Sequence, residues 1–217
     1  MIRLLIVLLL ISQTCHAGPW PRGAGKSFVA LSYEAPYLTG ETRPYSSLYF
    51  EYGLSDLWTV GLDAGADLHG SGSALAFLHR PIFSGDSPWK VSAEMAIGTA
   101  QIPTGRAFVV RPGLSVGRGY SVFNQTGWAT LDLFLTYAPD NTFWLGKAEG
   151  TVGLNLTRDS KLLLQVTSEQ TSLGERYHSV GFGGAYQIKP GLHVISGLVQ
   201  KSQSPVPNVK IGLWYSF

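Results

Sequence analysis

A histidine and a serine two residues apart could carry hydrolytic chemistry in this chain. They stand in the stretch Asp67-Leu68-His69-Gly70-Ser71. In such an arrangement an imidazole acts as the base, a hydroxyl as the nucleophile and a carboxylate orients the imidazole. The catalytic candidates are therefore His69, Ser71 and Asp67. The alternative is a polar loop, because glycine and serine are also the common residues of loops. We favour the loop and predict that the chain is not an enzyme.

Other catalytic and ligand-binding motifs are incomplete. Residues 23–27, Gly-Ala-Gly-Lys-Ser, match the end of a phosphate-binding loop. However, Trp20 stands where the first glycine of that loop belongs, and a strand pattern follows where a helix is required. Histidines 69, 79, 178 and 193 lack the spacing of metal ligands. The sequence predicts no metal and no cofactor.

The elements that position these residues are expected to be strands. Residues 89–97 read Trp-Lys-Val-Ser-Ala-Glu-Met-Ala-Ile, so apolar side chains occupy every second position. Successive side chains of a strand point to opposite faces. Residues 58–67, 129–137 and 161–169 repeat the alternation. The pattern is typical of a membrane barrel with apolar residues outside and polar residues inside. A β-sandwich, which would bury the apolar face, is the alternative.

Composition favours the barrel. Hydrophobic residues make up 45% of the chain, as in a membrane protein. Yet no apolar run after residue 17 reaches the roughly 20 residues of a transmembrane helix. Only helices and closed barrels satisfy the backbone inside lipid. The formal net charge of +2 argues against a nucleic-acid partner.

Residues 1–17 have the pattern of a cleaved Sec-type signal peptide. Arg3 supplies the charged start, residues 4–11 are apolar, and Cys15-His16-Ala17 precedes the expected cleavage before Gly18. Residues 18–217 are then one barrel domain without cysteine, because the single cysteine lies in the signal peptide. The expected location is the outer membrane.

Alternation and turn signals divide the domain into twelve expected strands, which would form one antiparallel transmembrane β-barrel. They cover residues 26–34, 46–54, 57–66, 73–83, 88–98, 107–117, 127–137, 143–156, 161–170, 177–187, 192–201 and 208–217. With both termini in the periplasm, the connections 35–45, 99–106 and 171–176 are extracellular. The periplasmic connection 118–126 is longer than such turns usually are.

The last strand runs to the final residue of the sequence. Its apolar face carries five side chains: Val209, Ile211, Leu213, Tyr215 and Phe217. A strand of this kind must pair along its length, because an exposed apolar edge aggregates. The ending resembles the assembly signal of Gram-negative outer-membrane proteins. That resemblance implies recognition by the barrel-assembly machinery.

Two stretches resemble a known group of barrels. They are Glu51-Tyr-Gly-Leu-Ser-Asp-Leu-Trp-Thr-Val-Gly-Leu-Asp-Ala-Gly65 and Gly18-Pro-Trp-Pro-Arg-Gly-Ala-Gly-Lys-Ser-Phe28. Both are similar to outer-membrane barrels described as related to the MetA pathway of phenol degradation and as transporters. The resemblance implies the fold and the location, and brings no catalytic residues.

Charged residues on the expected inner face could line a solute path. The alternative is a network of ion pairs that fills a narrow barrel. The inward set is Glu34, Glu51, Asp63, Asp67, Arg80, Lys90, Glu94, Arg111, Asp132, Lys147 and Glu149. Within it we expect an ion pair between Glu94 and Arg111, Asp132 near Lys147 or Glu149, and Lys90 beside Arg80.

The sequence thus predicts a narrow passage or binding pocket for a small solute, with an apolar solute as one option. A structural envelope barrel without transport is the first alternative. The second is a lipid hydrolase that uses His69 and Ser71, because their spacing of two positions resembles that of the histidine and serine in outer-membrane phospholipases. The expected partners are outer-membrane lipids, the barrel-assembly machinery and a small-molecule solute.

Overall fold

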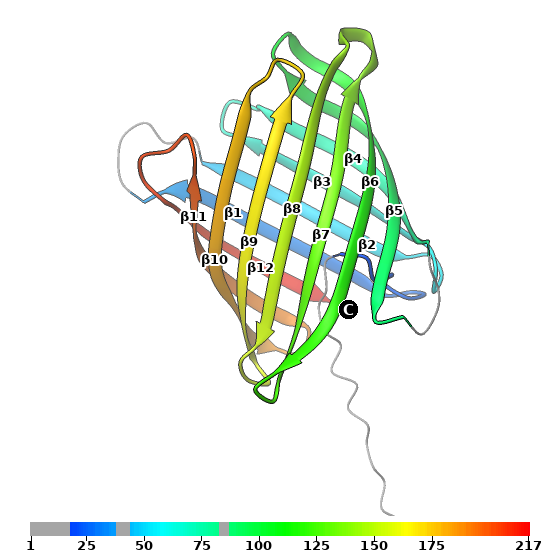
Figure 1. The fold of residues 1–217 in the computed structure, drawn as a ribbon, viewed down its shortest axis with the longest axis vertical. Helices are drawn as coiled ribbons and strands as arrows, with labels where there is room; N and C mark the ends of the chain where they lie inside the picture. Colours follow the sequence, from blue (N-terminus) through cyan, green and yellow to red (C-terminus); the bar gives the residue numbers. More distant parts are fainter. Residues whose placement is uncertain (1–17, 38–43, 83–86) are drawn as a thin grey trace, which may run out of the picture.

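Twelve antiparallel strands close into one barrel (Figure 1). The computed structural model describes residues 18–37, 44–82 and 87–217. The strands are β1 (Ser27–Pro36), β2 (Tyr45–Gly53), β3 (Thr59–Asp67), β4 (Gly72–Pro81), β5 (Trp89–Ile102), β6 (Gly105–Val122), β7 (Gln125–Ala138), β8 (Phe143–Asn155), β9 (Ser160–Thr171), β10 (Arg176–Lys189), β11 (Leu192–Lys201) and β12 (Asn208–Ser216). A 3-10 turn, η1 (Pro139–Asn141), joins β7 to β8. The predicted all-β fold class and strand number are confirmed, and each expected segment overlaps one strand.

The first and last strands close the sheet. β1 pairs with β2 on one side and with β12 on the other, in register from Phe28 opposite Ser216 to Pro36 opposite Asn208. Past this ladder, the Ser27 amide donates to the Phe217 carbonyl at 2.7 Å, and the Phe217 amide donates back at 3.1 Å. The terminal phenylalanine is therefore part of the closure that removes both sheet edges.

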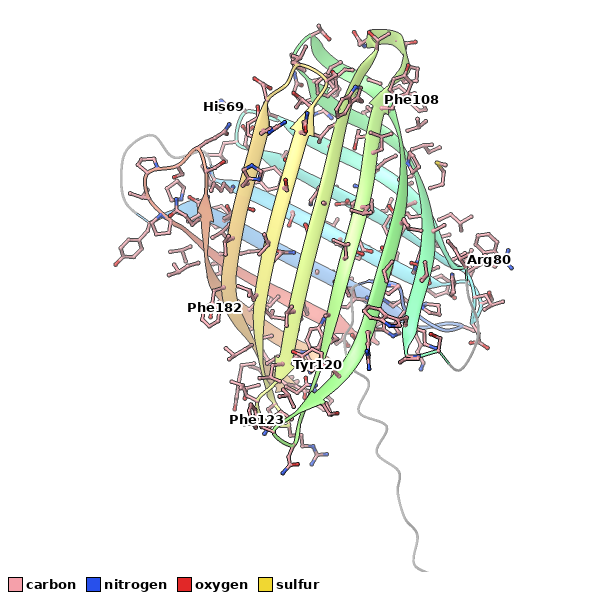
Figure 2. The ribbon with its side chains drawn as sticks, viewed as in Figure 1. His69, Arg80, Phe108, Tyr120, Phe123 and Phe182 are labelled. Carbon is pink, nitrogen blue, oxygen red and sulfur yellow. The ribbon has the colours of Figure 1, made fainter. Side chains whose placement is uncertain are left out.

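Side chains alternate between an apolar outer face and a mixed inner face. Along β7, Leu131, Leu133 and Leu135 are exposed on the outside, whereas Asp132 and Phe134 between them are partly buried inside. Figure 2 shows Phe108 and Phe182 pointing away from the barrel wall. Such a continuous exposed apolar surface is rare on water-soluble domains and marks a surface that contacts lipid or protein. The apolar side chains named above lie on this outer face, four of them on β12 and the fifth, Phe217, directly after it.

The expected long turn at 118–126 is wrong. Strand β6 continues to Val122 and β7 begins at Gln125, so only Phe123 and Asn124 form the turn. Both have positive φ, 49° and 63°. Two left-handed residues suit the twist of a tight hairpin, and asparagine tolerates this conformation. Phe123 stands 94% exposed at the tip (Figure 2).

The expected loop at 99–106 is also mostly strand. Strand β5 runs to Ile102 and β6 begins at Gly105, whose φ is 128°. Glycine adopts this backbone conformation without the clash a side chain would bring. The predicted signal peptide, residues 1–17, lies outside the described residues, as do residues 38–43 of the expected loop 35–45. Among the described residues, no helix is long and apolar enough to cross a membrane.

Candidate functional site

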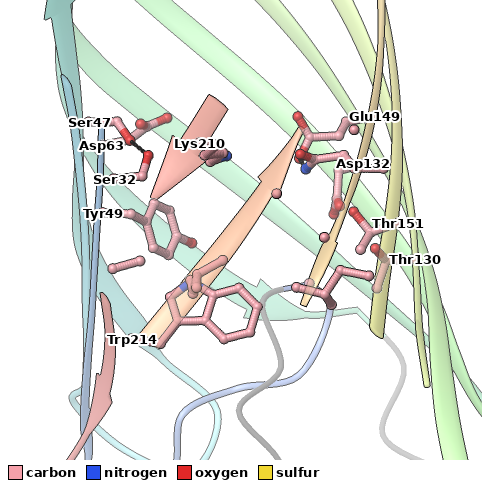
Figure 3. Close-up of a pocket in the computed structure, with 18 of the residues that line it drawn as sticks. Ser32, Ser47, Tyr49, Asp63, Thr130, Asp132, Glu149, Thr151, Lys210 and Trp214 are labelled. Carbon is pink, nitrogen blue, oxygen red and sulfur yellow. Dashed lines mark hydrogen bonds between the residues drawn. The ribbon is translucent and has the colours of Figure 1, made fainter. Parts of the chain in front are cut away.

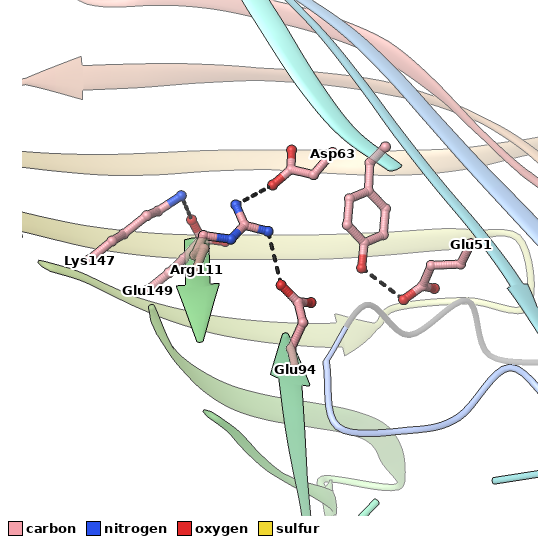
Figure 4. A network of polar contacts seen from close by, with 7 residues as sticks. Glu51, Asp63, Glu94, Arg111, Lys147 and Glu149 are labelled. Atoms are coloured by element: carbon pink, nitrogen blue, oxygen red, sulfur yellow. Dashed lines mark hydrogen bonds and ion pairs between the residues drawn. The ribbon is translucent and has the colours of Figure 1, made fainter. Parts of the chain in front are cut away.

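An arginine inside the barrel is held by two carboxylates from two different strands. The Arg111 guanidinium on β6 lies 2.6 Å from the Asp63 carboxylate on β3 and 2.9 Å from the Glu94 carboxylate on β5 (Figure 4). Glu94 is in register with Gly113, two residues from Arg111, so the pair is diagonal across the β5–β6 ladder. The predicted ion pair between Glu94 and Arg111 is confirmed. Asp63 is a second partner that the sequence did not reveal.

A second charged group lies on β7 and β8. Asp132 is directly opposite Glu149 in the β7–β8 register, as expected from the hairpin. The Lys147 ammonium lies 2.8 Å from the Glu149 carboxylate (Figure 4). The Gln165 side-chain amide on β9 donates to the same carboxylate at 2.7 Å. Glu149 is thus satisfied from two strands.

The third charged group binds the segment that precedes β1. Glu51 is 2% exposed and accepts a hydrogen bond from the Tyr49 hydroxyl at 2.8 Å. Its carboxylate also forms an ion pair with the Arg22 guanidinium. That guanidinium lies over the ring of Phe28, 4.2 Å from its centroid. The Arg22 amide donates to the Thr59 hydroxyl at 3.1 Å. This end of the segment is therefore fixed to β2 and β3.

The other end of the same segment reaches the far side of the barrel. Pro19 is fully buried. A Cβ added to Gly117 on β6 would lie 2.8 Å from atoms of Pro19 and Trp20, and one added to Gly18 would lie 2.7 Å from Thr130 on β7. In the strand order β7 is five places from β2. Residues 18–22 therefore cross the lumen at the end of the barrel where Phe217 lies, here called the Phe217 end.

A cavity of about 360 Å³ occupies the lumen (Figure 3). Gly18 lines it together with two tryptophans, Trp128 and Trp214. Trp128, which the alternation places inside the barrel, is 3% exposed. The charged groups that carry Arg111, Lys147 and Glu51 also line the cavity. Its size is within the range of sites for small molecules.

Glu34 and Lys90 lie on the inner face, as expected. The Glu34 carboxylate accepts from the Lys201 ammonium at 2.5 Å and from the Asn208 amide at 2.6 Å. Lys90 alternates with outward Trp89 and is partly buried. Lys201, Asn208 and Lys210 were not among the predicted lumen-facing residues. For Asn208 and Lys210 the alternation along β12 indicates the inner face, because both share their face with Trp214.

Arg80 does not face the lumen, which corrects the prediction. In the β4–β5 register His79 is opposite inward Glu94, so Arg80 lies on the outer face opposite Ala93. Figure 2 shows it at the barrel's outside, and its guanidinium lies 4.9 Å from the centroid of the Trp58 ring. The expected neighbourhood of Lys90 and Arg80 is wrong as well, because the two residues lie on opposite faces. His79 is the inward residue, 4% exposed.

The catalytic candidates lie in the tight β3–β4 loop, where Figure 2 labels His69. The Asp67 carboxylate accepts from the backbone amides of His69, at 2.9 Å, and Ser71, at 2.8 Å. Asp67 therefore holds the loop backbone in place. In the described part of the chain, no hydrogen bond joins the His69 imidazole to the Ser71 hydroxyl. No three histidine, cysteine, aspartate or glutamate side chains of the described residues are placed to hold a metal ion.

The chain matches no protein-family model, and no curated protein is similar to it in sequence. Solved structures share its fold. The KdgM porin superposes with a TM-score of 0.63 at 9% identity, over 88% of this chain and 99% of that one. A KdgM porin in complex with disordered oligogalacturonate gives 0.62 at 9% identity, over 88% and 99%. The NanC porin gives 0.62 at 11% identity, over 87% and 98%. At these identities the likeness concerns the fold.

Proposed function

We propose that this chain is an outer-membrane barrel that binds a small solute in its lumen and lets it pass. The observation that carries the proposal is the cavity of about 360 Å³ inside a closed barrel whose outer face is apolar. A closed sheet with this polarity is one of the two structures that a bilayer accepts. The lumen then offers a polar route across the lipid.

The outer surface supports the membrane location. Near the Phe217 end, Arg80 lies over Trp58, and Arg118 lies over Trp89 with its guanidinium 5.5 Å from the ring centroid. Aromatic rings with basic side chains are typical of the boundary between lipid and water. The similarity in fold to KdgM and NanC, which are porins, supports the same reading.

The ion pairs in the lumen favour a small solute over a large one. The ion pairs of Arg111 link β6 to β3 and β5. Residues 18–22 cross the opening at the Phe217 end. One KdgM structure is described with oligogalacturonate, an acidic polymer. The carboxylates of this lumen do not suit a chain of anions. The resemblance to barrels related to phenol degradation stays a prediction, and a small apolar or amphipathic solute is consistent with it.

Liposome swelling by the purified protein tests the proposal. Liposomes that contain the barrel should swell in small sugars or amino acids faster than protein-free liposomes. Thr151→Trp fills the cavity from β8 and should lower the rate, whereas Val152→Trp places the same ring on the outer face and should not. Equal rates with and without protein would favour the structural envelope barrel. Lipid hydrolysis that Ser71→Ala abolishes would favour the hydrolase instead.

A further inference from the structure

One wall of the cavity is apolar. Strands β10 and β11 contribute Gly183, Ile195, Gly197 and Val199 to it. Gly183 and Gly197 are direct register partners. A Cβ on Gly197 would lie 2.8 Å from the Phe182 carbonyl oxygen and 3.0 Å from the Gly183 Cα. These contacts are too close for a side chain, so backbone atoms alone form the wall at this point. An apolar group of a ligand can therefore lie directly against them.

Another part of the cavity lining carries the Asp132 carboxylate, on β7. Five carboxylates line the cavity: Glu51, Asp63, Glu94, Asp132 and Glu149. Four of them form the ion pairs described above. The Asp132 carboxylate accepts hydrogen bonds from the Ser115 and Thr130 hydroxyls. Among the residues that the structure describes, it has no ion pair.

A lysine on the other side of the cavity is its counterpart. Lys210 on β12 is in register with Glu34. The Glu34 carboxylate is taken by Lys201 and Asn208 instead. Within the described ranges, the Lys210 ammonium has no ion pair. Strand β12 is five places from β7, so Lys210 and Asp132 enter the lumen from nearly opposite sides (Figure 3).

We propose that the cavity binds a small zwitterion with an apolar body, such as an apolar amino acid. Its ammonium group lies at Asp132 and its carboxylate at Lys210. Its apolar part lies against the Gly183–Gly197 wall and the indole of Trp214, which also lines the cavity. This ligand class specifies the solute of the proposed function and rests on it.

Complementary charge and unused hydrogen-bonding groups carry the proposal. An ion pair inside a poorly hydrated lumen is stronger than one at the surface, provided that both charges are matched. A zwitterion matches both lumenal groups, whereas a cation or an anion leaves one of them unmatched. Buried polar atoms almost always have partners. Among the described residues, His79 Nε2 and Arg111 Nε have none, and both side chains line the cavity.

Calorimetric titration of the purified barrel in detergent tests the ligand class with three probes that share one ring. They are phenylalanine, phenethylamine and 3-phenylpropanoate. Phenylalanine should bind about tenfold more tightly than either single-charge analogue, since each charge-assisted contact is strong. Asp132→Asn should weaken phenylalanine and phenethylamine but leave 3-phenylpropanoate unchanged. Lys210→Gln should weaken phenylalanine and 3-phenylpropanoate but leave phenethylamine unchanged. Lys189→Gln, at the exposed end of β10, is the control.

Equal affinities for the three probes, no binding of any probe, or binding that neither lumenal substitution changes, would overturn the ligand class. Failure of the ligand class and failure of passage are distinguishable. Liposomes that swell without a preference among the probes retain passage and lose the zwitterion site. A barrel that binds phenylalanine as expected and does not swell liposomes retains the site and loses passage.

A second, independent observation concerns the segment that crosses the lumen. Residues 23–26 join it to β1 and are hydrogen-bonded to Gly53 at the end of β2: the Gly25 amide donates to the Gly53 carbonyl at 2.9 Å, and the Gly53 amide donates to the Lys26 carbonyl at 2.9 Å. Gly23 and Gly25 have φ of 79° and 73°. Glycine adopts this conformation without a steric penalty, so the chain can turn here from the lumen into β1.

We infer that residues 18–22 are a plug that closes the Phe217 end. The Arg22–Glu51 ion pair holds the plug closed. Pro19 and Trp20 fit against Gly117, where any larger residue would clash. The glycine at this position therefore provides the seat of the plug.

A disulfide between the plug and β7 tests the inference. A Cβ on Gly18 would lie 3.5 Å from the Thr130 Cβ, so Gly18→Cys and Thr130→Cys bring two thiols within bonding reach. Liposomes with the oxidised double variant should swell slowly and should recover their rate after reduction. Each single variant should be insensitive to reductant. Arg22→Gln should raise the swelling rate of the otherwise unchanged chain.

Failure of the two cysteines to form a disulfide would show that the segment does not lie against Thr130, and would overturn the inference. Equal swelling by the oxidised and reduced double variant would also overturn it, because the locked segment would then not control passage.

Discussion

Arg111 and Glu94 meet inside the barrel although they are not register partners. The guanidinium lies diagonally across the β5–β6 ladder from the Glu94 carboxylate, 2.9 Å away. It also forms an ion pair with the Asp63 carboxylate on β3, at 2.6 Å. The Arg111 and Glu94 side chains are only 11% and 10% exposed. A single cation therefore pairs with two carboxylates in a poorly hydrated space and couples β3 to β6.

Removing Arg111 should cost more stability than removing Glu94. Arg111→Met leaves two carboxylates without a cation, and we expect a loss of about 3–5 kcal/mol. Glu94→Gln leaves Arg111 paired with Asp63, and we expect about 1–3 kcal/mol. Urea unfolding in detergent micelles measures both. The double variant should lose less than the sum of the single losses. Strict additivity would show that the two groups do not interact.

The terminal phenylalanine should matter through its backbone and its ring. Deleting Phe217 removes both hydrogen bonds to Ser27 and the ring that stacks on Tyr215 at 4.9 Å. Phe217→Ala removes the ring alone. We expect the deletion to reduce the membrane yield of folded barrel more than the alanine variant does, with export unchanged. Normal heat-modifiable mobility and normal yield of the deleted chain would contradict this role in closure.

The β6–β7 hairpin turn predicts a position-specific effect. Asn124 has φ of 63°, and a β-branched residue there would cost about 1–2 kcal/mol. Asn124→Val should therefore lower the thermal unfolding temperature of the barrel. Ser121→Val, at an exposed position of β6 near the turn, is the matched control and should have little effect. Equal effects of the two substitutions would show that a β-branched side chain does not strain the left-handed conformation at residue 124.

The twelve strands were predictable because the outer and inner faces differ in polarity along most of them. Strand β4 shows where this signal ends. Leu75 and Phe77 are buried inside while Ala76 and Leu78 are outside, so apolar residues occupy both faces. Alternation then cannot assign a face to Arg80. The register with Glu94 on β5 decides it, and register is not readable from β4 alone.

Two further features depend on contacts that no local pattern records. The stretch at 118–126 has its turn at Phe123 and Asn124, without the glycine or proline that usually marks one. Residues 18–22 show no strand alternation, and their position follows from distant partners, Glu51 and Gly117. Likewise Asp63 is 48 residues from Arg111 and meets it only when the sheet curls into a barrel.

The central claim is that this barrel resides in the outer membrane, with its apolar face in lipid and its site in the lumen. Fractionation of expressing cells tests it most directly. We expect the protein, beginning at Gly18, in outer membranes washed with alkaline carbonate and urea, and a folded band that migrates faster before boiling. Recovery of the protein as a soluble periplasmic species would contradict the account.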